Sequence, residues 1–115
     1  MLYTLQGYEA TLYAYDPDNG SILWHLELDA DVATGGFAIG PDGTIYVPSY
    51  MNKLIAVSPD GYILWENDSI PSPGIPSFGP DGTLYVVGSS GYVKGDLYAL
   101  SPSGTIEWHL SLIHI

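Results

Sequence analysis

The sequence is organised as an internal repeat of about 40 residues, and this repeat limits the possible folds more than any other feature. Three short blocks recur in a constant order, with shifts of 39 to 43 residues between copies. The blocks are GPDGTIYV/GPDGTLYV at 40–47 and 79–86, LYAY/LIAV/LYAL at 12–15, 54–57 and 97–100, and ILW/ILW/IEW at 22–24, 63–65 and 106–108. Because three independent blocks keep one order and nearly one period, the chain is built from successive copies of one structural unit.

Each unit is predicted to contain four short strands. In the middle copy these are residues 37–39, 44–49, 53–58 and 62–66, which are rich in β-branched and aromatic side chains. Pro-Asp-Gly triplets separate the first strand from the second and the third from the fourth. Such triplets suit tight turns because Pro presets φ, Asp bonds the neighbouring backbone and Gly accepts positive φ. The sequence therefore predicts an all-β fold.

The strand interiors indicate how these sheets are packed. In LIAV at residues 54–57 both alternating faces are apolar, so neither face is expected to meet water. A period near 40 with several short strands, each sheet covered on both sides by its neighbours, is typical of β-propeller blades. We predict four-stranded antiparallel blades.

The chain holds about two and two-thirds of these blades by our count, since residues 2–4 align with the second strand of a unit. We divide it into an incomplete blade at 1–34, a complete blade at 35–73 and a further blade at 74–109. Residues 110–115 resemble a translated sequencing-adapter end, the alternative being a genuine last strand. Closed propellers have about four to eight blades. We therefore expect a fragment whose partners are the remaining blades of the same propeller, and which self-associates when expressed alone.

The chain is strongly acidic, because it has 13 Asp and Glu residues and only two basic residues, Lys53 and Lys94, for a net charge of −11. Such a chain is not expected to bind nucleic acid or anionic lipid, because both need a cationic surface. There is no Cys, which excludes disulfides and thiolate chemistry. No apolar run approaches the roughly 20 residues of a membrane helix, so membrane insertion is not expected.

Residues 14–24 (AYDPDNGSILW) resemble the tryptophan-docking motif of pyrroloquinoline-quinone (PQQ)-like repeat propellers, the family of the quinoprotein alcohol dehydrogenases. Ala14, Asp16, Gly20 and Trp24 match this motif. The later copies conserve all but the Asp, which Ser replaces, and their turns are one residue shorter; the matching residues are Ala56, Gly61 and Trp65, and Ala99, Gly104 and Trp108. The resemblance implies that the three Trp side chains pack between neighbouring blades.

The same resemblance raises a quinone-dependent dehydrogenase as an alternative, with PQQ and Ca²⁺ at the propeller axis. We identify no catalytic, cofactor-binding or metal-ligating residue to carry over, and we expect no cofactor in this fragment. The segment 16–20 (DPDNG) superficially resembles a calcium loop. An EF-hand requires an oxygen ligand at the fifth position and Gly at the sixth, where this chain has Gly20 and Ser21, so we interpret the segment as a turn.

Our functional hypothesis is a non-enzymatic scaffold or binding module that contacts proteins or ligands through its loops. Tyr92 and Lys94, in a loop longer than its counterpart in the preceding unit, are the candidate contacts. Relatives that the resemblance brings in include the lipoprotein scaffold of the outer-membrane barrel-assembly machinery. By that resemblance we expect a periplasmic, cell-surface or secreted parent protein. The alternatives are part of a quinone-dependent dehydrogenase and a sensor domain of a membrane-anchored protein.

Overall fold

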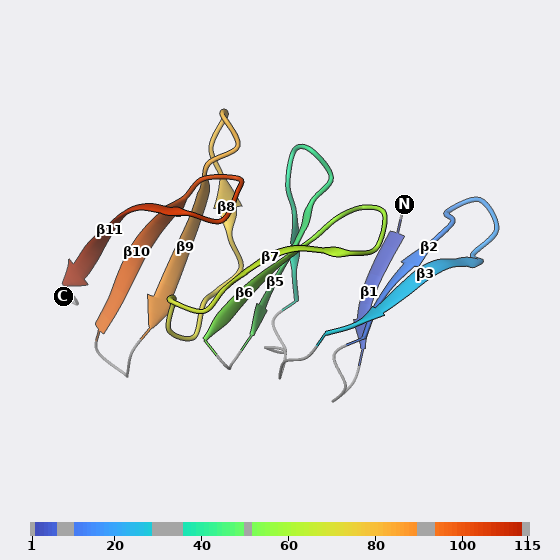
Figure 1. Cartoon of the computed structure of the whole chain (residues 1–115), viewed down its shortest axis with the longest axis horizontal. Helices are drawn as coiled ribbons and strands as arrows, with labels where there is room; N and C mark the ends of the chain where they lie inside the picture. Colours follow the sequence, from blue (N-terminus) through green and yellow to red (C-terminus); the bar gives the residue numbers. More distant parts are fainter. Residues whose placement is uncertain (1, 7–10, 29–35, 50–51, 90–93, 114–115) are drawn as a thin grey trace.

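The computed structural model describes residues 2–6, 11–28, 36–49, 52–89 and 94–113. Every described element is a β-strand, arranged in three antiparallel sheets that stand side by side like a fan (Figure 1). The first sheet contains β1 (Leu2–Gln6), β2 (Thr11–Tyr15) and β3 (Ile22–Glu27). The second contains β4 (Ala38–Ile39), β5 (Ile45–Ser49), β6 (Lys53–Val57) and β7 (Ile63–Asn67). The third contains β8 (Ser77–Phe78), β9 (Leu84–Ser89), β10 (Lys94–Leu100) and β11 (Ile106–Ile113).

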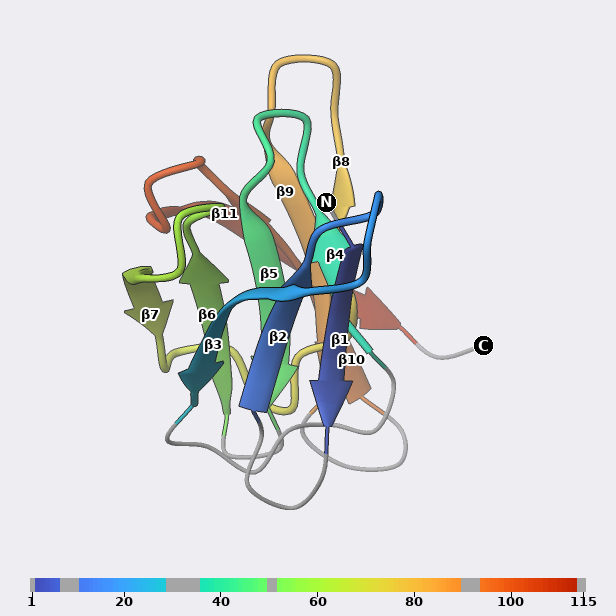
Figure 2. The same cartoon turned by 90° about the vertical axis from the view of Figure 1, so that its right-hand side faces the viewer.

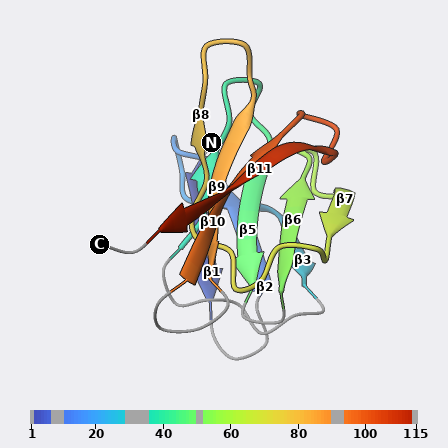
Figure 3. The same cartoon turned by 90° about the vertical axis from the view of Figure 1, so that its left-hand side faces the viewer.

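Strand order follows chain order in every sheet, so each sheet is a meander with all neighbours antiparallel. The predicted all-β, blade-like fold is confirmed; we call the sheets the first, middle and last blades. Viewed end-on they lie one behind another, with their faces opposed (Figures 2 and 3). No helix in the described ranges is long and apolar enough to cross a membrane.

The four strands predicted for the middle blade are all present, with small differences at their ends. Its first strand is only Ala38–Ile39, which pairs with two residues of β5. The third strand ends at Val57 because Ser58 belongs to the following turn: its amide donates to the carbonyl of Tyr62 and its carbonyl accepts from the amide of Gly61. The ends of the strands are therefore decided by turn hydrogen bonds.

The last strand is longer than its equivalents in the other blades. β11 continues through Ile113 and pairs with β10 along its length, with Leu110 opposite Leu97 and Ile113 opposite Lys94. Residues 110–113, which we interpreted as an adapter sequence or a last strand, thus have strand geometry. Residues 114–115 lie outside the described part of the chain.

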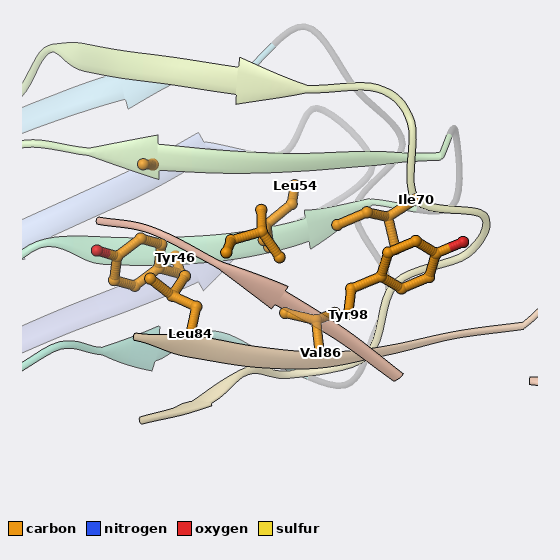
Figure 4. Packing of buried hydrophobic residues seen from close by; sticks show 8 residues of the cluster. Tyr46, Leu54, Ile70, Leu84, Val86 and Tyr98 are labelled. Atoms are coloured by element: carbon orange, nitrogen blue, oxygen red, sulfur yellow. The ribbon is translucent and has the colours of Figure 1, made fainter. Parts of the chain in front are cut away.

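Two apolar cores hold the blades together, one in each gap between sheets. The core between the first and middle blades contains Leu12, Leu28, Ile45, Val47, Ile55 and Val57. The core between the middle and last blades contains Tyr46, Leu54, Ala56, Ile70, Leu84, Val86, Tyr98 and Leu100 (Figure 4). The alternating residues of β6 therefore face opposite neighbours: Ile55 and Val57 face the first blade, and Leu54 and Ala56 face the last. This explains why both faces of LIAV are apolar.

Candidate functional site

The junction between the first and middle blades is built around the side chain of Trp24. β3 carries this residue, and its indole Nε1 donates a hydrogen bond of 2.9 Å to the carbonyl oxygen of Pro59 in the next blade. The ring lies against Gly61, where an added Cβ would be 2.8 Å from Trp24 Cδ2. Gly61 has φ +96°, a backbone conformation that residues with a side chain rarely adopt. This position therefore needs Gly for two reasons: its backbone conformation and the close approach of the Trp24 ring.

The junction between the middle and last blades repeats the same geometry. Trp65 Nε1 donates a 2.9 Å hydrogen bond to the carbonyl oxygen of Pro102. Its ring lies against Gly104, where a Cβ would be 2.5 Å from Trp65 Cδ2. Asn67 Nδ2 adds a 2.9 Å bond to the carbonyl oxygen of Gly104. Two Trp residues one repeat apart therefore bind equivalent turns of the following blade.

The third copy of the motif lies at an open face. Trp108 is 47% exposed, although its ring lies 6.2 Å, centroid to centroid, from that of Tyr85 in its own blade. At the opposite end of the fan, Gly20 in the turn of the first blade has φ +74°, and a Cβ there would meet no heavy atom within 4 Å. Trp108 is therefore equivalent to the Trp of a blade junction, and Gly20 is equivalent to the glycine against which that Trp packs.

The alanines of the motif are all fully buried, and each stands directly opposite a Trp on the neighbouring strand: Ala14 opposite Trp24, Ala56 opposite Trp65, and Ala99 opposite Trp108. A small side chain leaves room for the indole ring beside it. The motif thus combines a large and a small residue across one strand pair.

The acidic member of the motif caps its own turn. Asp16 Oδ1 accepts a 2.9 Å bond from the amide of Asp18. In the middle blade Ser58 Oγ accepts a 3.0 Å bond from the amide of Asp60 at the equivalent place. Since the hydroxyl oxygen substitutes for the carboxylate oxygen, the change from Asp to Ser retains the turn bond.

A shallow depression of about 360 Å³ lies where turns of the middle and last blades come together. It is lined by Pro41, Asp42, Tyr46, Pro80, Asp81, Gly82 and Pro102. This depression was not predicted from the sequence. The sequence did contain a sign of it, because the turn GPDG occurs at 40–43 and again at 79–82. Equivalent turns of adjacent blades lie along the same edge of the molecule (Figure 1).

The depression has apolar walls and an acidic rim. Asp42 and Asp81 are exposed, and each uses Oδ1 to accept a 3.1 Å bond from the amide two residues later, Thr44 and Thr83 respectively. The hydrogen bonds from the backbone amide and side chain of Thr83 hold the pKa of Asp81 below its usual range. Both carboxylates are therefore turn caps that also place negative charge beside the opening.

Tyr46 lines the depression and also belongs to the core, being 2% exposed. Burial raises the pKa of its phenol, the charge of Asp42 raises this pKa further, and a hydrogen bond with Thr44 acts in the opposite direction. Burial also raises the pKa values of Tyr3 and Tyr98. Neutral phenols are thus favoured in the folded protein.

This shift predicts a loss of stability in alkali. An unfolded Tyr ionises near pH 10, so the stabilisation is present below that pH and is lost as pH rises through the higher folded pKa. We expect the urea midpoint of unfolding to fall between about pH 9 and pH 11, and to fall less in Tyr46→Phe. Equal losses in both proteins would contradict a role for Tyr46. Urea titrations at each pH, followed by far-ultraviolet circular dichroism, would measure the midpoint of unfolding.

The remaining charged contacts are few in the part of the chain that the structure describes. Lys53 Nζ lies 4.0 Å from Glu66 Oε2, and His109 Nδ1 lies 3.6 Å from Asp96 Oδ2. Within the described ranges no group of three His, Cys, Asp or Glu side chains is arranged to hold a metal ion. The structure places the backbone of Lys94 at the start of β10, and not in the loop where we predicted it, whereas Tyr92 lies outside the described residues.

Comparison with known proteins agrees with this architecture. A family model described as outer membrane protein assembly factor BamB matches residues 8–113, which is nearly the whole chain. A search of curated protein sequences found no match to this chain. The repeated blades and the extent of the family match lead to one assignment: the chain belongs to the BamB-like family of PQQ-like repeat proteins.

Proposed function

We propose that this chain is part of a non-enzymatic β-propeller scaffold that binds a protein segment in the depression between its turns. The observation that carries the proposal is the depression itself, which brings together Pro41, Pro80, Pro102 and Tyr46 with the acidic residues Asp42 and Asp81. Proline and aromatic walls suit an extended peptide, and the acidic rim suits its basic groups.

The use of the other motif residues supports a scaffold. Trp24 and Trp65 bind the next blade, and Asp16, Asp42 and Asp81 cap their own turns. These side chains stabilise the framework, and the outer surfaces of the turns that they hold are left to make contacts. Tyr92 and Lys94 remain proposed contacts, separate from the depression.

The family description supports an exported location and a class of partner. The matching family is described as an outer membrane protein assembly factor, and we propose that the parent protein acts in the periplasm or at the cell surface on client proteins of the outer membrane. The competing proposals are a quinone-dependent dehydrogenase and a sensor domain. The dehydrogenase is tested together with the scaffold.

The test measures binding of a denatured outer-membrane β-barrel protein, diluted from urea, to the immobilised chain. Asp42→Asn with Asp81→Asn keeps both turn caps but removes two charges, and we expect it to weaken binding about tenfold, roughly 0.7 kcal/mol for each charge. The matched control is Asp18→Asn with Asp68→Asn, which removes two exposed charges outside the depression and is expected to bind as the original chain does.

Equal weakening by both variant pairs would contradict a role for the depression. A parallel titration with PQQ and Ca²⁺, followed by tryptophan fluorescence and by dye-linked oxidation of alcohols, tests the dehydrogenase. Saturable quinone binding with alcohol oxidation would overturn the scaffold proposal in favour of the enzyme.

A further inference from the structure

The two ends of the fan present different faces, each equivalent to a face that is covered inside the molecule. We call the side of the last blade that is turned away from the middle blade the tail face. It consists of Tyr85, Val87, Leu97, Trp108 and Leu110 around the buried Ala99. Along β9 and β10 these residues alternate with those that face the middle blade. Val87, Trp108 and Leu110 are 46%, 47% and 58% exposed.

The tail face repeats the covered side of the middle blade. Tyr85, Leu97, Ala99 and Trp108 occupy the positions of Tyr46, Leu54, Ala56 and Trp65, with the same residue at all four places. In the middle blade this set packs against the last blade, and Trp65 bonds its turn. The tail face therefore has four of the residues of a blade junction, whereas Leu110 and Val87 stand where the middle blade has Asn67 and Pro48.

We call the exposed side of the first blade the head face; it includes Leu2, Tyr13, Tyr15 and His25, together with the turn at Gly20. Tyr13 and Tyr15 alternate with Leu12 and Ala14, which are turned toward the middle blade, and the rings of Tyr13 and Tyr15 stack at 6.2 Å.

The head face repeats the side of the last blade that covers the middle blade. Leu2, Tyr13, His25 and Gly20 correspond to Leu84, Tyr98, His109 and Gly104, again with the same residue at every place. Even the ring contact recurs: Tyr13 with His25 at 5.9 Å, and Tyr98 with His109 at 5.5 Å. Each half of the junction between the middle and last blades thus has a partial copy on one terminal blade, with Tyr15 in place of Leu100 on the head face.

We propose that a second copy of this chain docks head-to-tail, its head face covering the tail face of the first. The indole ring of Trp108 then lies against Gly20, and its Nε1 donates to a carbonyl oxygen of the 16–21 turn, as Trp65 does at Gly104. Because the two faces differ, the contact is heterologous and leaves one face of each kind free for further copies. The proposal rests on the blade junctions and not on the proposed partner of the depression.

Charge opposes this association and provides a diagnostic. Each copy carries a net charge of −11, so two copies repel at low ionic strength. Added salt screens this repulsion and leaves the apolar contact in place. The association is therefore expected to strengthen as salt is raised.

The test uses two variants that each disable one face. Trp108→Ala removes the ring from the tail face and is expected to weaken association about 30-fold or more, as for other central Trp contacts. Gly20→Asn fills the head face; Asn tolerates positive φ, and open space surrounds that position in the single copy. Leu64→Ala, an exposed leucine of the middle blade, is the matched control.

Sedimentation velocity of the original chain over a wide range of concentration should show reversible dimers and larger species, as should Leu64→Ala. Each face variant alone should remain monomeric at the concentrations where the original chain associates. A mixture of the two should form a one-to-one heterodimer that grows no further, because the intact tail face of Gly20→Asn meets the intact head face of Trp108→Ala. A monomeric original chain, or a mixture without heterodimer, would overturn the proposal.

Discussion

Replacing Trp65 with Ala is expected to lower the free energy of unfolding by about 3 kcal/mol, as large-to-small changes of packed Trp residues do. The variant loses the ring that fills the gap above Gly104 and the bond to the carbonyl oxygen of Pro102. It also exposes part of the core between the middle and last blades, against which Trp65 packs. Urea unfolding followed by circular dichroism measures the change.

The control is the equivalent change at the open tail face. Trp108→Ala is expected to cost less than about 1 kcal/mol, because the ring is 47% exposed and binds no turn of another blade within the described residues. Both variants are made in the Gly20→Asn background so that self-association does not contribute. Equal losses at the two positions would show that Trp65 stabilises its own blade and not the junction.

Replacing Gly104 with Ala is expected to destabilise the chain by about 3 kcal/mol, from backbone strain and overpacking together. Gly104 has φ +90°, where an L-residue is strained, and its added Cβ would lie 2.5 Å from the ring of Trp65. The ring is held by its own bond to Pro102, so the collision separates two blades.

The matched control lies in the same blade. Gly82 has φ +86°, and its Cβ would lie 3.6 Å from Pro102 Cγ, an ordinary contact. Gly82→Ala therefore introduces only the backbone strain and is expected to lower the free energy of unfolding by about 1 kcal/mol. The difference between the two variants, measured by urea unfolding, isolates the ring contact. If Gly104→Ala cost no more than Gly82→Ala, the indole would not be a rigid part of the junction.

Much of the fold was predictable because the repeat supplies the same information several times. Four strands of the middle blade follow from β-branched runs between Pro-Asp-Gly turns, and the two apolar faces of residues 54–57 predict a sheet covered on both sides. The short β4 was less predictable, since its end depends on pairing with only two residues of β5. Strand ends depend on local hydrogen bonds that the residue types do not specify.

The site residues were only partly predictable. The family resemblance singled out the Ala, Gly and Trp positions, but it did not say that Trp24 bonds Pro59 and Trp65 bonds Pro102. The depression was not predicted because its lining comes from three turns that are far apart in the chain and from a core residue, Tyr46. Proximity of that kind arises only when two blades pack.

The sequence by itself determined the unit of structure: a 40-residue repeat of short strands, its turn chemistry and its acidic charge, because each depends on neighbouring residues. Only the tertiary structure decided which Trp binds a turn and which is open. Trp24, Trp65 and Trp108 occupy the same place in their repeats, yet two lie against the glycine of a following blade and one is exposed. The difference lies in what stands beside each blade, which is a property of packing and not of local sequence.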